Sequence, residues 1–250
     1  MKIVVIGGSG LIGSQLIEKL SEAGHEAVNA SPQTGIDTLT GAGLAEVMRG
    51  ADAVVDVSNS PSFEDAAVME FFTTSTANQL EAERAAGVGH HIALSIVGTD
   101  ALPDSGYLRA KHAQEQAIQD GPTPYTILRS TQFFEFVGRI ADAAYDGEVI
   151  RLPTALMQPI ATADVVVGLA ALAQGSPRNA VVEIAGPESF PLDELARRVL
   201  RVNGDPRRIE GDPHATYYGT ELDDGSLRPG PGARIGELRL ADWLPQTVTS

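Results

Sequence analysis

The sequence has no cysteine and only three lysines among its 250 residues. Without cysteine, the chain forms no disulfide, holds no metal through thiolates and has no cysteine nucleophile. Its five histidines are scattered, and the adjacent His90 and His91 would point to opposite faces of a strand. These histidines suit structural roles better than joint metal ligation, so we expect no metal site.

Positive charge is also scarce. The 33 acidic residues outnumber the 18 basic ones, which gives a formal net charge of −15 at pH 7. A surface this acidic repels nucleic acid and anionic membranes. No apolar run reaches the length of a membrane span, and the chain opens on a strand pattern at residues 2–6 rather than on a signal peptide. We therefore expect a cytoplasmic protein without nucleic acid or membrane partners.

Short apolar runs alternate with helical patterns over the first 130 residues. The predicted strands are 2–6, 25–30, 53–57, 92–97 and 125–128. Helical patterns begin at Leu11 and cover 63–86 and 105–119. This alternation predicts an α/β fold, with a doubly wound parallel sheet covered by helices on both faces.

The pattern loosens after residue 130. Helices are expected at 133–144, 163–173 and 192–202, and a strand at 181–184. Residues 204–236 are rich in Gly, Pro and Asp, which predicts loops.

Glycines cluster directly after the first strand, in Gly7-Gly8-Ser9-Gly10-Leu11-Ile12-Gly13. The segment fits both G-x-x-G-x-x-G and G-x-G-x-x-G, and it opens an amphipathic helix. Glycines at these places permit a tight turn, close approach of backbone N–H groups to a pyrophosphate, and close packing of helix on strand. The loop therefore predicts binding of a nicotinamide dinucleotide. The predicted contacts are Gly7, Ser9, Gly10, Leu11, Ile12 and Gly13.

The segment after the second strand bears on the choice between NAD and NADP. NAD enzymes usually place an acid there to bind the ribose 2′-hydroxyl, whereas this chain has Asn29-Ala30-Ser31-Pro32. The missing acid favours NADP. No Arg or Lys is there to bind a phosphate, so NAD stays possible, with Ser31 as a hydrogen-bonding contact. Asp37 is a candidate acceptor for the adenine amine, and Ser58 and Asn59 follow the third strand, where ligands bind in such sheets.

Tyr107 and Lys111 lie four residues apart in a predicted helix, and so on one face. A tyrosine has a pKa of about 10, and a neighbouring ammonium lowers it toward the range useful for acid–base catalysis. The same lysine is a candidate contact to the cofactor ribose. Ser95 is the candidate for orienting a substrate carbonyl, and Thr99 is its rival.

Several segments resemble the short-chain dehydrogenase/reductase superfamily, specifically its atypical, extended, NmrA-like branch. They are the glycine loop, 53–56, 94–98, Tyr107-x-x-x-Lys111, 125–129, 158–165 and 183–187. The resemblance implies a Rossmann sheet of about seven strands and a small C-terminal substrate-binding region. We accordingly assign residues 1–150 to the dinucleotide-binding core, and 151–250 to a part that completes the sheet and binds substrate. It also implies Tyr107 as the acid/base, Lys111 as its helper and Ser95 as the carbonyl-binding hydroxyl.

Ser95 and Tyr107 are only 12 positions apart, closer than in many extended members, which keeps Thr99 open as the hydroxyl. Many NmrA-like relatives lack the Tyr/Lys pair and act as redox sensors, whereas this chain retains it. We therefore expect an NAD(P)-dependent oxidoreductase that acts on a carbonyl compound and functions as a monomer or homodimer. The phenylalanines at 133, 134 and 136 favour an aromatic or quinone-like small-molecule substrate, with Phe133 and Phe134 as contacts.

Two other functions remain open. One is a non-catalytic NAD(P) sensor. The other is a nucleotide-sugar epimerase or dehydratase, which would need basic groups for the sugar diphosphate. The candidate groups are Arg207, Arg208, Arg228 and Arg234.

Overall fold

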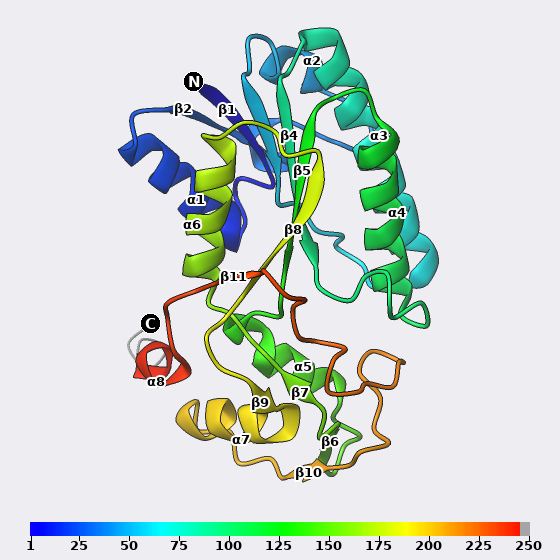
Figure 1. Ribbon diagram of the computed structural model, residues 1–250. Helices are drawn as coiled ribbons and strands as arrows, with labels where there is room; N and C mark the ends of the chain where they lie inside the picture. Colours follow the sequence, from blue (N-terminus) through cyan, green and yellow to red (C-terminus); the bar gives the residue numbers. More distant parts are fainter. Residues whose placement is uncertain (246–250) are drawn as a thin grey trace. The chain divides into compact units, whose positions relative to one another are not determined.

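The structure is a computed structural model that describes residues 1–245. Its centre is a seven-stranded parallel sheet in the order β11-β8-β5-β4-β3-β1-β2 (Figure 1). The strands are β1 Lys2–Ile6, β2 Glu26–Ala30, β3 Ala53–Asp56, β4 His90–Ile96, β5 Tyr125–Ser130, β8 Ala180–Ala185 and β11 Arg234–Ile235. This confirms the α/β fold and the seven-stranded sheet expected from the sequence.

β1 lies between β2 and β3, and its apolar sequence explains that place. Val4 pairs with Val28 of β2 on one side and with Val54 of β3 on the other. A strand covered on both faces carries consecutive apolar residues rather than alternating ones, and residues 3–6 are all buried.

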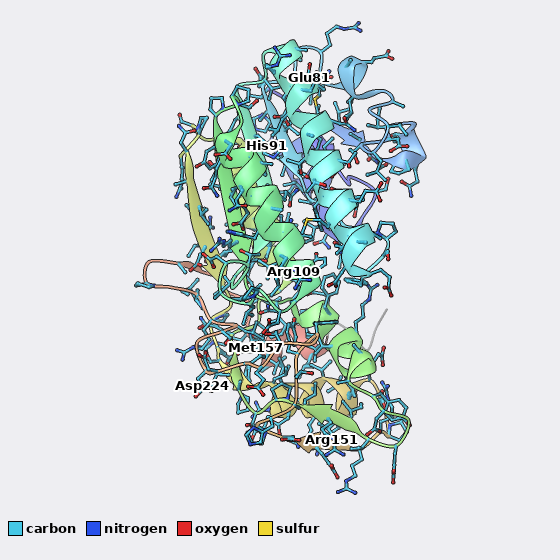
Figure 2. All side chains as sticks on the ribbon, turned by 90° about the vertical axis from the view of Figure 1, so that its right-hand side faces the viewer. Glu81, His91, Arg109, Arg151, Met157 and Asp224 are labelled. Atoms are coloured by element: carbon cyan, nitrogen blue, oxygen red, sulfur yellow. The ribbon has the colours of Figure 1, made fainter. Side chains whose placement is uncertain are left out.

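Helices cover both faces of the sheet. Figure 1 shows α1 (Leu11–Glu22) and α6 (Thr162–Ala173) on one face, and α3 (Asp65–Ala86) and α4 (Gly106–Asp120) on the other. In Figure 2, α3 and α4 lie side by side toward the viewer. Two shorter helical segments, η1 Pro32–Thr34 and α2 Leu44–Val47, follow β2.

The chain forms two compact units, and each is built from separate stretches of sequence. The first unit contains Met1–Arg129 and Val165–Val182, and the second contains Ser130–Asp164 and, of the described residues, 183–245. The division at residue 150 expected from the sequence stays a prediction.

The second unit holds short elements that pair with distant residues. Besides β11, its elements are η2 Phe134–Phe136, α5 Val137–Ala143, β6 Ile150–Leu152, β7 Leu156–Met157, β9 Phe190–Pro191, α7 Leu192–Val202, β10 Ile209–Gly211 and α8 Leu240–Trp243. β6 pairs with β10 in parallel, and β7 pairs with β9 antiparallel. Such pairings leave little local pattern, and for that reason sequence analysis found none of these short strands.

The helix expected at 133–144 is shorter in the structure. Phe133 has an extended backbone and bridges to Ile160, so the helical segment begins with a 3₁₀ turn and becomes α-helical only at Val137. The fourth strand starts at His90, two residues earlier than expected. Within residues 1–245, no helix combines the length and apolarity needed to cross a bilayer.

Candidate dinucleotide site and the residues around Tyr107

The glycine loop joins β1 to the N-terminus of α1. Gly7 has a left-handed backbone with φ 79°, and its carbonyl accepts a hydrogen bond from the Gly10 N–H at 2.9 Å. Gly10 is the N-cap residue of α1; it supplies no capping side chain, and the first turn holds no acidic residue. The first-turn N–H groups of a helix have no intrahelical acceptor. This end of α1 therefore suits an anion.

The loop is close-packed, and glycine at its closest contacts makes this packing possible. A Cβ on Gly13 would overlap the Gly7 carbonyl oxygen and lie 2.6 Å from the Gly8 Cα. A Cβ on Gly7 would lie 2.9 Å from the Cα of Ser58. The loop thus packs against itself and against the segment after β3, and it fits the pyrophosphate of a dinucleotide.

Neutral polar groups surround the end of β2. The Ser9 hydroxyl lies 2.7 Å from that of Ser31 and accepts a hydrogen bond from the Asn29 amide at 3.0 Å. The Ser31 N–H donates to the Thr34 hydroxyl at 3.1 Å, which fixes the turn into η1. Ser9 and Ser31, both predicted cofactor contacts, are therefore joined directly.

Asp37 lies in the loop after η1 and organises that loop. One of its carboxylate oxygens accepts from the Leu39 N–H at 2.8 Å and from the Thr40 N–H at 3.3 Å. The backbone hydrogen bond from Leu39 is the main cause that lowers the pKa of Asp37 below its ordinary value. Contact with adenine stays a prediction for this residue.

Tyr107 is held at the start of α4. Its hydroxyl donates to the Asn59 Oδ1 at 2.8 Å, and its ring meets those of Phe63 at 5.6 Å and Phe72 at 5.9 Å. Asn59 follows Ser58, which packs on Gly7. A short series of contacts therefore connects the glycine loop to the Tyr107 phenol inside the first unit.

The residues before Tyr107 explain its position. The Ser105 hydroxyl caps α4 by accepting from the Leu108 N–H. Gly106 packs against the Asp65 carboxylate so closely that a Cβ would overlap it. Arg109, labelled in Figure 2, donates to the same carboxylate at 2.5 Å and to the Pro103 carbonyl at 2.6 Å. These contacts join the N-termini of α3 and α4.

Lys111 points into the protein interior. Its side chain is almost fully buried, and its ammonium donates to the Leu94 carbonyl at 2.8 Å and to the Gln114 Oε1, while lying 4.5 Å from the centre of the Phe72 ring. Burial lowers the pKa of Lys111 to about 8, against the opposing effects of the Asp56 and Glu115 carboxylates. Tyr107 and Lys111 thus contact the same ring.

The two candidate hydroxyls, Ser95 and Thr99, both donate to one carboxylate oxygen of Glu115, at 2.5 and 3.3 Å. Arg129 binds the same carboxylate through Nε and Nη2, and it reaches Asp100 through Nη1 at 2.9 Å. Ser95 and Glu115 are each 1% exposed. The structure therefore brings both hydroxyls to Glu115, and the choice between them as a substrate contact stays a prediction.

Phe133 and Phe134 belong to the second unit, and both are buried there. The Phe134 ring stacks on Trp243 at 5.2 Å, and the Phe133 ring lies 5.3 Å from that of Phe136. The Phe134 contact is core packing; substrate binding stays a prediction for both residues.

Sequence reasoning missed the partners that hold the site together. Asp56 ends β3, is 2% exposed and accepts hydrogen bonds from Gln79 and Gln114. A signal was present, because Asp56 is the one charged residue in an apolar strand and Gln114 lies one helical turn after Lys111.

His90 and His91 have different partners. His90 lies 2.9 Å from the Thr126 hydroxyl, and His91 lies 2.7 Å from a Glu83 carboxylate oxygen, both within the protein interior. Burial alone lowers the pKa of His91, but the Glu83 charge and hydrogen bond outweigh it and raise that pKa. Both histidines therefore have structural roles in the described fold.

The parallel sheet and its glycine loop define a Rossmann-type protein that binds a dinucleotide. A family model described as NAD(P)H-binding matches residues 7–174. The chain belongs to this NAD(P)H-binding family.

Known proteins agree with that assignment. The photosystem II assembly factor Ycf39 of Synechocystis sp. is 23% identical over 234 residues, which cover 86% of this chain and 72% of Ycf39. This similarity fits the atypical, NmrA-like branch of the short-chain dehydrogenase/reductase superfamily and confirms the resemblance seen in the sequence.

Solved structures of extended superfamily members share the fold. A double mutant of DesIV, a dTDP-glucose 4,6-dehydratase from Streptomyces venezuelae, solved with NAD, has a TM-score of 0.76 at 19% identity, over 100% of this chain and 96% of that one. The UDP-glucose 4-epimerase of Thermus thermophilus, also solved with NAD, has a TM-score of 0.74 at 17% identity, over 100% and 98% of the two chains.

Proposed function

We propose that this protein is an NAD(P)-dependent oxidoreductase that reduces or forms a carbonyl group on a small apolar molecule. The observation that carries the proposal is the position of the Tyr107 hydroxyl. It is bonded to Asn59, and Asn59 follows the residue on which Gly7 packs. An acid–base group therefore lies two contacts from the loop that would bind the dinucleotide.

In this proposal, Tyr107 handles the proton. When bound, the nicotinamide donates or accepts the hydride. Tyr107 gives its hydroxyl proton to the substrate oxygen during reduction and takes it back during oxidation. The Tyr107 hydroxyl donates its one proton to Asn59, which holds the phenol in place. That hydrogen bond opens when the same proton passes to the substrate oxygen. Lys111 supplies a positive charge in an interior where charges interact strongly, which favours the tyrosinate.

NADP is the preferred cofactor in this proposal. No acid lies in the turn after β2 to repel a 2′-phosphate, and the paired Ser9 and Ser31 hydroxyls with the Asn29 amide supply neutral hydrogen-bonding groups. No lysine or arginine lies between Lys19 and Arg49. We therefore expect NADPH to bind more tightly than NADH by a modest factor rather than exclusively.

The nucleotide-sugar alternative receives less support from the contacts of the second unit. Arg207 is bound to the carboxylates of Asp205 and Asp142, and Arg208 pairs with Glu210. For Arg207 and Arg208, binding a sugar diphosphate would require these pairs to break, whereas Arg228 and Arg234 stay candidates for that role. The sensor alternative is decided by the turnover experiment below.

The test compares the wild type with Tyr107→Phe. Binding of NADPH and NADH is measured by calorimetry, and oxidation of each is followed with a panel of quinones, ketones and aldehydes. We expect Tyr107→Phe to bind cofactor as the wild type does and to lose about 10²- to 10⁴-fold in kcat, the usual contribution of a general acid. The control is Tyr145→Phe, which removes a hydroxyl bonded to the Gly147 carbonyl in the second unit and should keep its rate.

Two results would contradict the proposal. Tight cofactor binding without turnover on any acceptor would support the sensor function instead. Full turnover by Tyr107→Phe on a good substrate would show that another group moves the proton.

A further inference from the structure

Asp56 is a buried carboxylate at the end of β3, between the glycine loop and α4. One of its oxygens accepts from the Ser58 N–H at 2.9 Å and from the Ser58 hydroxyl at 2.6 Å. The other accepts from the Gln79 amide at 3.2 Å and the Gln114 amide at 3.0 Å. Among residues 1–245, none of the ion pairs includes Asp56. Burying a carboxylate this way is costly unless its hydrogen bonds are all made.

The two oxygens lead to two different residues of the proposed active site. On one side, Asp56 fixes Ser58, and the next residue, Asn59, accepts the Tyr107 hydroxyl at 2.8 Å. On the other side, Asp56 binds the Gln114 amide NH₂. A primary amide with its NH₂ committed must present its carbonyl oxygen elsewhere, and the Gln114 Oε1 accepts the Lys111 ammonium.

We propose that Asp56 is a positioning residue that orients Tyr107 through Asn59 and Lys111 through Gln114. This inference rests on the proposed function, because Asp56 can be a positioning residue only if Tyr107 and Lys111 take part in catalysis. Asp56 is the residue from which both series of contacts start. Gln79 binds the same Asp56 oxygen but leads to neither active-site residue, so it provides a matched control.

Charges also connect Asp56 to Lys111. The charged groups around the ammonium are Asp56 on β3, Glu115 on α4, and the His91–Glu83 pair of β4 and α3. Burial lowers the pKa of Lys111, while Asp56 and Glu115 raise it, so that it stands at about 8. Removal of the Asp56 charge should lower it further and leave the amine partly neutral near pH 7.

The experiment uses the scarcity of lysine. Protein labelled with ¹³C-lysine should give three side-chain signals, which Lys2→Arg and Lys19→Arg assign by elimination. The Lys111 signal is then titrated in the wild type, Asp56→Asn, Gln114→Met and Gln79→Met. We expect a midpoint near pH 8 in the wild type. It should fall in Asp56→Asn and in Gln114→Met, and stay near the native value in Gln79→Met.

Turnover gives the second measurement. Gln114→Met should lower kcat by about tenfold and leave the KM for cofactor unchanged, because it disturbs the orientation of Lys111 rather than cofactor binding. Its pH–rate profile should move in the same direction as the Lys111 titration.

The outcomes separate this inference from the proposed function. If the wild type shows no turnover, the proposed function fails, and the lysine titration still decides whether Asp56 controls Lys111. An unchanged Lys111 midpoint in Asp56→Asn and Gln114→Met overturns the inference. So does an equal displacement in Gln79→Met and Gln114→Met, because it would reflect looser packing around Asp56. If Asp56→Asn does not fold, Gln114→Met against Gln79→Met carries the same test.

Discussion

The glycine loop and the buried polar residues beneath α4 are built in opposite ways. The loop is one contiguous segment, residues 7–13, and its shape depends on glycine at the positions where the backbone packs most closely. The buried polar residues at α4, namely Asp56, Gln79, Ser95, Lys111, Gln114, Glu115 and their partner Arg129, come from five elements. Asp56 and Gln114, which bond directly, are 58 residues apart. An added side-chain atom should therefore disrupt the glycine loop, whereas the loss of a hydrogen-bonding atom should disrupt the buried polar residues.

The largest expected effect follows from adding one carbon to the loop. Gly13→Ala would place a Cβ against the Gly7 carbonyl and 2.6 Å from the Gly8 Cα. Alanine is otherwise favoured over glycine in a helix by about 1 kcal/mol. A loss of cofactor affinity in this variant would therefore come from the clash and not from a weaker helix. We expect NADPH binding to weaken by at least about 100-fold, or about 2.8 kcal/mol, by calorimetry.

The control for Gly13→Ala is Gly138→Ala. Gly138 also lies in a helix, and a Cβ there meets nothing within 4 Å. This variant should keep native affinity and gain slightly in stability. Native affinity in Gly13→Ala would contradict the interpretation of the loop as a close-packed cradle.

The second effect follows from removing a carboxylate beneath α4. Glu115→Ala leaves the partly buried Arg129 with Asp100 alone and leaves the buried Ser95 hydroxyl without its acceptor. Breaking a buried ion pair from one side costs about 3 kcal/mol. We expect the free energy of unfolding in urea to fall by about that amount. Cofactor affinity should fall far less than in Gly13→Ala, because Glu115 does not contact the loop and acts only through the charge of Lys111.

Glu81→Ala is the control for this variant. Glu81, labelled in Figure 2, pairs with Arg84 on the exposed side of α3. Exposed pairs of this kind contribute at most about 0.5 kcal/mol. Equal losses in the two variants would show that the buried carboxylate has no special role.

The same contrast explains what could be predicted from the sequence. The glycine loop and the Tyr107/Lys111 spacing are local patterns whose meaning depends on a few neighbouring residues, and the alternation of apolar runs fixes the sheet in the same way. The roles of Asp56, Gln114 and Glu115 depend on partners that only the folded chain brings near. Ser95 illustrates the limit: its place in the strand was predicted correctly, but its bond to Glu115, 20 residues later, has no local signal.

The smallest expected effect is a pH dependence of stability. It also separates the two regions, because residues 7–13 contain no ionisable side chain, whereas the buried polar residues do. The Glu83 carboxylate raises the pKa of the buried His91 above its ordinary value of 6.5, despite the opposing effect of burial. A raised pKa means that the folded state binds the proton more tightly, so this contribution is complete below pH 6.5 and is lost as pH rises through the folded pKa. The stability gap between the wild type and His91→Asn should therefore narrow with rising pH, as should the gap for Glu83→Gln, in urea unfolding from about pH 6 to 9. A gap that stays constant would mean that the pair contributes packing and hydrogen bonding but no charge.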